Sequence, residues 1–367
     1  MSDWAPQIVK IEKVIAHPNA DALDLVTVLG DYPIVVKRGE YKVGDLTCYV
    51  PIDSIVPDTE QYYFLCPKAY EKYEDENGVI QQRQVGPKYA VGSVPEKYRI
   101  VKAKRIRNVY SQGMLVQLPK LIGTIRSVGD SVVDILELKK WEEEVDDAIV
   151  NVKLRGANAA APPKGWSIPY YDLESIRKYI SLVENEQDII LTEKLNGSNA
   201  SYVFDGNDLW IKSRNFYKKW DEDDMWVGIA IRCSLKEKLS NYPMMVFFGE
   251  VVNQVKKFRY NDKIINGELP TDFYCFDIYD VINNKFLDYD DFASICKKLE
   301  VSTTPILYRG PWTSKEKIYQ YAEGKSTLNE KIVREGFVLS VAKERFEPKL
   351  NGRLKLKLVG ECYNLQK

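Results

Sequence analysis

A segment with few packing side chains lies near the middle of this 367-residue chain and divides it in two. An acidic stretch ending Glu-Glu-Glu-Val-Asp-Asp at residue 147 is followed, between residues 156 and 165, by small residues and prolines. Because a single hydrophobic core rarely grows beyond about 250–300 residues, a chain of this length is expected to hold two domains. We therefore predict domains at 1–145 and 169–367, joined by a linker at 146–168.

The composition is that of an ordinary globular protein, with 45% hydrophobic residues, 29% charged residues and a net charge of −1. No apolar run approaches the ~20 residues of a membrane span, and the N-terminus lacks the pattern of a secretion signal. The six scattered cysteines favour free thiols in a reducing compartment over a zinc site. We predict a cytoplasmic protein without a membrane partner. Its single histidine, His17, makes a mechanism based on histidine unexpected.

The N-terminal part reads as a β-rich domain. Short strand-like segments separated by turn residues are expected at 8–14, 25–29, 34–37, 46–50 and 99–103. Strands at this spacing indicate a small β-barrel. The segment His17-Pro-Asn-Ala-Asp-Ala-Leu23 resembles the first turn of OB-fold domains that bind tRNA or other nucleic acid, with His17 as a turn residue beside Pro18.

A basic run lies in this N-terminal part, although the net charge of the chain is small. Residues 97–107 read KYRIVKAKRIR, with six basic residues and no acidic one. Because local basic faces engage nucleic acid, we predict contacts from Lys102, Lys104, Arg105 and Arg107. The alternative is a solvated edge strand that its charges protect.

The C-terminal part alternates strand-like and helix-like segments and indicates an α+β domain with antiparallel sheets. The turn 205–208, Asp-Gly-Asn-Asp, predicts a hairpin between strands at 201–204 and 209–212. Further strands are expected at 189–195, 244–252, 274–279, 337–341 and 353–359, and helices at 172–183, 223–240, 289–299 and 314–323.

A lysine at the end of the strand at 189–195 is followed by an ordered series of polar motifs. Lys194 lies in Leu191-Thr-Glu-Lys-Leu-Asn-Gly-Ser-Asn199. The later motifs are, in order, Ser213-Arg-Asn215, Phe247-Phe-Gly-Glu250, Phe273-Tyr-Cys-Phe-Asp-Ile278, Arg334-Glu-Gly-Phe337 and Leu354-Lys-Leu-Lys357.

These motifs suit a lysine that attacks phosphorus. A lysine near its ordinary pKa of ~10.4 is protonated, so cations and desolvation must lower the pKa of Lys194 before it can attack. Lys355 and Lys357 lie two apart on one predicted strand, hence on one face, where they could repel that charge and neutralise phosphates. The alternative is a solvated lysine face. Glu250 and Glu335 lie at strand ends beside a glycine, and carboxylates suit Mg²⁺.

Together the six motifs resemble those of the covalent nucleotidyltransferases, the superfamily of DNA ligases, RNA ligases and mRNA capping enzymes. The resemblance covers about residues 167–359 and implies an α+β nucleotidyltransferase domain, an ATP-grasp-like ligase domain. It implies that Lys194 attacks the α-phosphate of ATP to form lysyl-AMP. AMP then passes to a 5′-phosphate of a nucleic acid, and a 3′-hydroxyl attacks as AMP leaves. Such phosphoryl transfer depends on positioning and charge neutralisation rather than on histidine.

The resemblance also implies which residues bind ATP. Glu193 would read the adenine amino group, and Arg177 would reach the γ-phosphate. Phe276 would stack on adenine. A core position for Phe276 is the alternative, with Phe273 or Tyr274 taking the stacking role.

Metal and nucleic-acid ligands are implied in the same way. Glu250 and Glu335 would contact the ribose or hold a divalent cation, together with Asn196. Many ligases carry Asp at the position of Asn196, and a neutral amide cannot fully replace a carboxylate in holding metal-bound water. Arg214 would contact the ribose or the 3′-end nucleotide, and Asn199 would act in the sealing step.

The order of the domains narrows the choice within the superfamily. DNA ligases and capping enzymes usually place an OB domain after the strand of Lys355 and Lys357, whereas here it comes first. This order resembles the ATP-dependent RNA ligases with an N-terminal OB domain. We predict a monomeric RNA ligase that uses ATP and Mg²⁺ or Mn²⁺ to seal 5′-phosphate and 3′-hydroxyl RNA ends. Its expected role is the repair of RNA nicks or breaks, with a nicked duplex as substrate. The alternatives are a DNA ligase of rearranged order and a non-catalytic nucleic-acid-binding relic, against which the retained motif residues argue.

Overall fold

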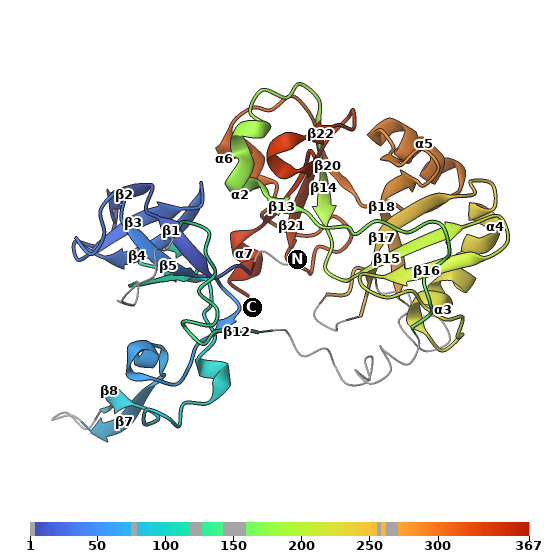
Figure 1. Ribbon diagram of the computed structural model, residues 1–367. Coiled ribbons are helices and arrows are strands. Elements are labelled where there is room, and N and C mark those ends of the chain that lie inside the picture. Colours follow the sequence, from blue (N-terminus) through green and yellow to red (C-terminus); the bar gives the residue numbers. More distant parts are fainter. Residues whose placement is uncertain are drawn as a thin grey trace. The chain divides into compact units, whose positions relative to one another are not determined.

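The computed structural model describes residues 4–74, 79–117, 127–141, 159–254, 258–261 and 271–366. The chain forms two compact units, an N-terminal unit (residues 1–143) and a C-terminal unit (residues 144–366). Figure 1 colours them from blue to teal and from green to red. Across the described ranges, no helix is both long and apolar enough to cross a lipid bilayer. All six cysteines are described, and none forms a disulfide.

The N-terminal unit is built from short antiparallel strands, as its sequence predicts. Its strands are β1 (Gln7–Lys10), β2 (Lys13–Ala16), β3 (Leu23–Val28), β4 (Tyr32–Lys37), β5 (Leu46–Val50), β6 (Ser54–Ile55), β7 (Lys68–Glu74), β8 (Ile80–Pro87), β9 (Lys104–Ile106), β10 (Val109–Ser111), β11 (Met114–Val116) and β12 (Lys139–Lys140). Two three-stranded sheets, in the orders β1-β5-β11 and β2-β3-β4, carry most of its apolar core. The strand predicted at 8–14 is two strands, because Ile11 turns into the core between them.

The strand predicted at 99–103 is not formed, and strand structure begins only at β9. Val101 and Ala103 are buried, and the Val101 amide donates to Ser54 O at 2.8 Å. This stretch therefore runs alongside β6 without forming a strand, and its one β-bridge among the described residues joins Ile100 to Ile55. The side chains of the four predicted nucleic-acid ligands, Lys102, Lys104, Arg105 and Arg107, are exposed.

His17 is a turn residue, as predicted, and it also fastens the turn to the basic segment. It is buried, with Nδ1 accepting from the Asn19 amide at 3.1 Å and Nε2 3.0 Å from Ile106 O. Asn19 Nδ2 donates to Arg107 O at 2.9 Å. The turn thus fixes the backbone of the segment that carries the basic side chains.

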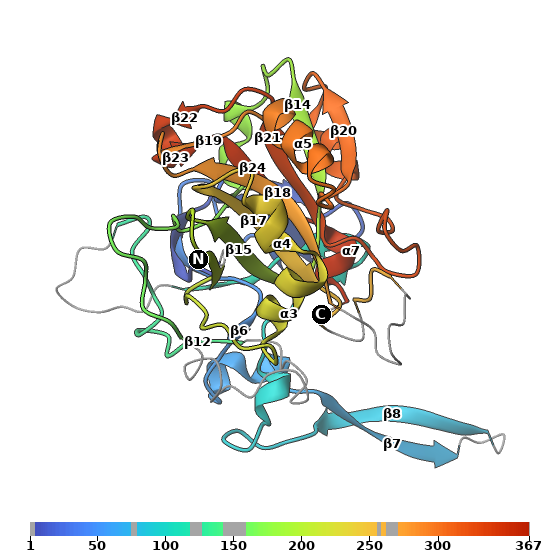
Figure 2. The same cartoon turned by 90° about the vertical axis from the view of Figure 1, so that its right-hand side faces the viewer.

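The hairpin of β7 and β8 extends from the N-terminal unit as a two-stranded ribbon, most clearly in Figure 2. A 3-10 helix η1 (Glu60–Leu65) precedes it and another, η2 (Glu96–Tyr98), follows. Most of its side chains are exposed, so hydrogen bonds between its two strands, rather than an apolar core of its own, stabilise the hairpin.

The C-terminal unit consists of two five-stranded sheets with helices against them (Figure 1). Its strands are β13 (Glu174–Ser175), β14 (Ile189–Lys194), β15 (Ser198–Phe204), β16 (Leu209–Ser213), β17 (Met245–Val252), β18 (Asp272–Asp280), β19 (Lys285–Phe286), β20 (Ile306–Gly310), β21 (Gly336–Val341), β22 (Phe346–Glu347), β23 (Gly352–Arg353) and β24 (Lys355–Val359). Its helices are α2 (Ile176–Tyr179), η3 (Ile180–Leu182), α3 (Met225–Arg232), α4 (Leu235–Leu239), α5 (Tyr289–Lys298), α6 (Lys315–Gln320), η4 (Pro348–Leu350) and α7 (Glu361–Asn364).

The two sheets have the orders β13-β24-β21-β14-β20 and β16-β15-β17-β18-β19. They are antiparallel, as predicted, apart from the short parallel pair of β13 and β24. The hairpin of β15 and β16 turns at 205–208, as the sequence predicts. Apolar side chains of α3, α4 and α5 pack on the second sheet, and Figure 2 shows α4 beside β17 and β18.

The helix predicted at 172–183 is shorter than expected and begins at Ile176. Glu174 and Ser175 are extended and pair with Leu356 and Lys357. The Ser175 hydroxyl then caps the helix by accepting from the Arg177 amide at 3.3 Å. Sheet pairing and an N-cap thus move the start of the helix past the acidic residues that had predicted it.

The predicted linker is only partly described, since residues 146–158 lie outside the described residues. Residues 159–168 do not span open space. The Ala160 amide donates to Tyr217 O and the Ile168 amide to the Tyr217 hydroxyl, both at 2.9 Å. Trp166 packs edge-on against Trp210 at 5.9 Å between ring centroids. This stretch therefore packs against the rest of the C-terminal unit, where Ala160, Trp166 and Ile168 contribute to one apolar cluster.

Candidate active site

A pocket of about 450 Å³ in the C-terminal unit is lined by residues of both sheets. Eight of the site residues predicted from the sequence line this pocket, namely Glu193, Lys194, Asn199, Arg214, Glu250, Phe276, Lys355 and Lys357. Residues more than 160 positions apart meet here because β14 and β24 lie in one sheet while β15, β17 and β18 lie in the other.

Lys194 is the last residue of β14 and lies opposite Gly336 of β21. Its Nζ lies 2.7 Å from Glu335 Oε1, and its side chain is 26% exposed, so a ligand can reach it. A Cβ on Gly336 would lie 1.9 Å from Leu358 O, which requires glycine at this position. The glycine beside Glu335 thus lets β21 run close to β24 while Glu335 meets the lysine.

Glu250 lies on β17 opposite Asn199 of β15. Burial raises the pKa of Glu250 to about 8; Lys194 and Arg214 lower it in part, and Glu335 adds to the rise. Glu335 Oε2 is buried and, among the described residues, has no hydrogen-bond partner. Glu250 in the pocket wall and Glu335, which is not part of that wall, are therefore two carboxyl groups near one lysine, and a cation would relieve both.

Glu193 is buried beside the lysine, and only one of its two carboxylate oxygens accepts hydrogen bonds from the described residues. Its Oε2 accepts from the Thr327 amide at 2.8 Å and from the Thr327 hydroxyl at 2.5 Å. Its Oε1 is buried without a hydrogen-bond partner in the part of the chain that the structure describes. Because a buried acceptor of this kind is costly unless satisfied, Oε1 is suited to accept from a ligand donor in the pocket.

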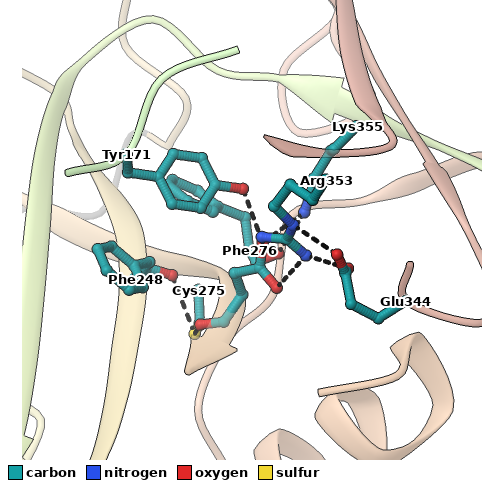
Figure 3. Close-up of polar contacts among 8 residues, drawn as sticks. Tyr171, Phe248, Cys275, Phe276, Glu344, Arg353 and Lys355 are labelled. Carbon is teal, nitrogen blue, oxygen red and sulfur yellow. Dashed lines mark hydrogen bonds and ion pairs between the residues drawn. The ribbon is translucent and has the colours of Figure 1, made fainter. Parts of the chain in front are cut away.

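Lys355 lies in a buried ionic network, which Figure 3 shows. Its Nζ donates to Asp277 Oδ2 at 2.8 Å and to Phe276 O at 3.2 Å. Arg353 bridges Asp277 and Glu344, and its guanidinium lies over the Phe286 ring at 3.7 Å. Lys355 is therefore a buried residue of the pocket wall, and the alternative of a solvated lysine is wrong for this residue.

The network also sets the protonation of its members. Burial lowers the pKa of Lys355, which Asp277 opposes and Arg353 reinforces. Burial acts to raise the pKa of Asp277, but Arg353 and Lys355 together hold it below its ordinary value. Tyr171 donates to Asp277 Oδ2 at 2.7 Å and closes the network on the side of Phe276.

Of the three aromatic residues considered for base stacking, Phe276 lines the pocket. Its ring lies 5.0 Å from that of Tyr171. Phe273 instead packs edge-on against Tyr202 in the apolar core, at 5.0 Å between centroids, and Tyr274 packs against another apolar cluster, which includes Leu195. Arg214 lines the pocket and pairs with Asp172 at 3.4 Å.

Two predicted ligands point elsewhere. Arg177 is buried on α2, with its guanidinium 5.3 Å from the Tyr319 ring centre, and is not part of the pocket wall. Asn196 also stays out of that wall, and its Nδ2 donates to the Tyr363 hydroxyl at 2.6 Å. Within the described residues, no three His, Cys, Asp or Glu side chains gather into a metal-binding group.

The sequence analysis missed Tyr171 and Lys218, which line the pocket, and three residues of the buried network that holds Lys355, namely Asp277, Glu344 and Arg353. Asp277 was inside a quoted motif, and a carboxylate in the middle of an apolar strand was the signal that it needed a buried cation. Arg353 lies two positions before Lys355, so alternation could have placed it on the same side. Lys218 lines the pocket while paired with Asp224 at 3.0 Å, and nothing in the sequence marks it.

Comparison with known proteins agrees with this geometry. A family model described as RNA ligase matches residues 187–359, and an OB-fold domain model matches residues 6–85. No curated protein matches the chain.

Solved structures of Naegleria gruberi RNA ligase resemble the whole chain. A lysine-to-alanine variant with ATP and Mn is 23% identical over 99% of both chains, with a TM-score of 0.73. A glutamate-to-alanine variant with AMP and Mn is 22% identical over 99% of both chains, also with a TM-score of 0.73. The ligase with pyrophosphate is 24% identical over 98% of this chain and 97% of that chain, with a TM-score of 0.70. At these identities the likeness shows a shared fold.

The RNA ligase match and the lysine pocket between two antiparallel sheets both fall in the C-terminal unit, which is a ligase domain by its fold. Residues 187–359 match the RNA ligase family model, and an OB-fold domain precedes them. The predicted fold class and the predicted order of the two folds are confirmed.

Proposed function

We propose that this protein is an ATP-dependent RNA ligase that seals 5′-phosphate and 3′-hydroxyl ends through lysyl-AMP. The observation that carries the proposal is the place of Lys194, in a pocket with Glu193, Glu250, Lys355 and Lys357. Its family, matched over residues 187–359, supports the same reaction.

In the first step Lys194 Nζ forms a bond to the α-phosphorus of ATP. The bond from that phosphorus to the bridging oxygen breaks, pyrophosphate leaves, and Nζ loses a proton. Glu335 Oε1, at 2.7 Å, holds Nζ and is placed to accept that proton. Lys355 and Lys357 line the same pocket and offset the phosphate charge as it develops.

The adenine would lie between Phe276 and the open oxygen of Glu193. A stacked base presents its amino group at its edge, and Glu193 Oε1 is an acceptor that is buried and lacks a partner among the described residues. An acceptor in this position favours adenine, which offers an amino donor, over guanine, which offers a carbonyl.

Glu250 and Glu335 would hold a divalent cation, for which carboxylate oxygens are suitable ligands. The buried Glu335 Oε2, without a partner in the described residues, fits this role. When bound, Mg²⁺ or Mn²⁺ neutralises phosphate charge, and the N. gruberi ligase variants were solved with Mn.

The later steps use RNA. The α-phosphorus of lysyl-AMP accepts a 5′-phosphate oxygen while the P–N bond breaks, and the 3′-hydroxyl then attacks the 5′-phosphorus while AMP leaves. Arg214 and Asn199, at the wall of the pocket, are candidates for holding the 3′-end nucleotide. The exposed Lys102, Lys104, Arg105 and Arg107 would contact phosphates of a nicked duplex, which a monomer could bind.

Sealing of nicked duplexes tests the proposal and its main competitor. Nicks with RNA or with DNA on the 3′-hydroxyl side are compared, with ATP and Mg²⁺ or Mn²⁺. We expect ATP-dependent sealing that favours RNA and disappears in Lys194→Ala. Preference for a DNA 3′-hydroxyl would identify a DNA ligase of rearranged order, and absence of sealing on both would indicate a binding protein.

A further inference from the structure

The loop that follows Lys194 is tied to the C-terminal helix α7. Asn196 Nδ2 donates to the Tyr363 hydroxyl at 2.6 Å, and the Asn196 amide donates to the Tyr260 hydroxyl at 2.7 Å. Tyr260 and Tyr363 are each 2% exposed, so both hydrogen bonds are shielded from solvent. The loop is thus held from two sides, at the second residue after the lysine.

Helix α7 is itself fixed at its N-terminal end. Glu323 accepts from the Glu361 amide at 2.6 Å and from the Cys362 amide at 3.1 Å. The Gly360 amide donates to Glu335 O at 2.8 Å, which links the helix to the residue that pairs with Lys194. A Cβ on Gly360 would lie 2.5 Å from Ala322 O, so the chain approaches closely there.

The Tyr363 ring is part of the apolar cluster beneath the loop. It packs against Phe258 at 5.6 Å between centroids, in a cluster that includes Leu195, the residue after Lys194. Leu195 and Asn196 therefore contact the same tyrosine cluster, one by apolar packing and one by hydrogen bonds. A shift of α7 would move the residues next to Lys194.

Asn196 has the wrong orientation for the metal role that its position suggested. Lys194, Leu195, Gly197 and Ser198 line the pocket, whereas Asn196 does not. Its donor hydrogen bond to Tyr363 uses the amide that an aspartate would lack. Asn196 is therefore suited to hold the loop against Tyr363 and is not suited to bind a cation.

We infer that Tyr363 is a positioning residue for Lys194 that acts through Asn196. The inference rests on the proposed function, since it concerns attack of Lys194 on ATP. In-line attack requires Nζ within about 3–3.5 Å of phosphorus, and a misplacement of about 1 Å can cost on the order of 10²-fold in rate. The two hydrogen bonds to Asn196 limit such displacement.

The test separates the lysine step from the sealing step. Tyr363→Phe and Asn196→Ala are compared with wild type in single-turnover formation of lysyl-AMP, and in joining of a nicked RNA that already carries AMP on its 5′-phosphate. The second reaction needs no attack by Lys194 on ATP. We expect lysyl-AMP formation to slow about tenfold in Tyr363→Phe at saturating ATP, with little change in half-saturating ATP or in joining of the adenylylated nick.

A double-mutant cycle identifies the route. If Tyr363 acts through Asn196, adding Tyr363→Phe to the Asn196→Ala variant has little further effect on the rate of lysyl-AMP formation. Asn196→Asp, whose carboxylate can accept from the tyrosine hydroxyl, should recover most of the rate that Asn196→Ala loses. Tyr217→Phe is the matched control, because it also removes a buried tyrosine hydroxyl bond, to the Ile168 amide at 2.9 Å. We expect it to leave lysyl-AMP formation unchanged.

Three results would overturn the inference. The first is that Tyr363→Phe and Asn196→Ala both form lysyl-AMP at the wild-type rate. The second is that these variants slow lysyl-AMP formation and joining of the adenylylated nick equally. The third is that the effects of the two substitutions on lysyl-AMP formation are fully additive in the double mutant. If Tyr363→Phe does not fold, the two reactions of Asn196→Ala decide alone. A wild-type protein that forms no lysyl-AMP would instead contradict the proposed function, a separate result.

Discussion

At the scale of single residues, the charges around Lys194 are more balanced than the motifs alone indicate. The sequence suggested that Lys355 and Lys357 together repel a charge on Lys194. The structure pairs Lys355 with Asp277 at 2.8 Å, so part of its charge is neutralised. Glu335 meanwhile contacts Lys194 directly. Repulsion of Lys194 by Lys355 is therefore weaker than the motifs alone indicate.

Asp277→Asn tests the buried network. The change leaves Arg353 and Lys355 without the carboxylate they share, and removing one partner of a buried ion pair costs about 3–5 kcal/mol. We expect a loss of this size in the free energy of unfolding, measured with denaturant, together with loss of lysyl-AMP formation. Asp290→Asn is the control, because Asp290 pairs with Arg309 at an exposed site and should cost less than about 1 kcal/mol. Equal losses in the two variants would contradict the role of burial.

Glu250 gives a pH dependence with a definite sign. Its pKa is about 8 in the folded protein and 4.5 ordinarily, so between these values the folded state holds a proton that the unfolded chain has lost. The stabilisation is complete below about pH 4.5 and is lost as pH rises through about 8. Between pH 5 and 8 the unfolding free energy of wild type should fall by on the order of 1–3 kcal/mol relative to Glu250→Gln. Parallel pH curves for the two proteins would show that Glu250 is not shifted.

At the scale of elements, the sequence predicted strands better than helices. The strands at 189–194, 209–213 and 245–252 are recognisable because apolar residues and turn signals mark them directly. The start of α2 was not predictable, because it depends on pairing of Ser175 with a strand that is 180 residues away. Partners such as Asp277 and Arg353 were missed for the same reason: their meeting is set by tertiary register, which no local pattern contains.

Gly197→Ala tests how closely the lysine loop lies against β17. A Cβ at this position would lie 2.1 Å from Val251 O, a backbone atom that cannot move aside alone. We expect a loss of about 1–3 kcal/mol in unfolding free energy and a fall of about tenfold or more in lysyl-AMP formation, since the loop must shift.

Gly228→Ala in α3 is the matched control for Gly197→Ala. Its Cβ would meet only Arg232 Nη1, at 3.6 Å. In a helix interior this change should be neutral or stabilise by up to about 1 kcal/mol. A tolerated Gly197→Ala would show that the loop is not confined by β17.

At the scale of the whole molecule, an OB-fold domain and an RNA ligase domain share one chain. The exposed basic residues of the N-terminal unit and the pocket of the C-terminal unit can be tested separately, because one should affect RNA affinity and the other the chemistry. The sequence predicted the order of the two folds, since each has its own local pattern.

Lys104→Ala and Arg105→Ala test RNA contact by the N-terminal unit. If each side chain neutralises one phosphate, the slope of log affinity against log salt should fall by about 0.7–0.9 per substitution. Binding to a nicked RNA duplex is titrated at several salt concentrations. Lys297→Ala, an exposed lysine of α5, is the control and should leave the slope unchanged. If all three variants have the wild-type slope, the basic residues are solvated charges at the edge of the domain and do not contact nucleic acid.

The central claim is that Lys194 is the residue that carries AMP. The protein is incubated with ATP and Mn²⁺, denatured, digested and mapped by mass spectrometry, with Lys194→Arg in parallel. We predict one AMP per chain, on the peptide that contains Lys194, and no adduct in the variant. An adduct on another residue, or none from ATP in the wild-type protein, would contradict the account.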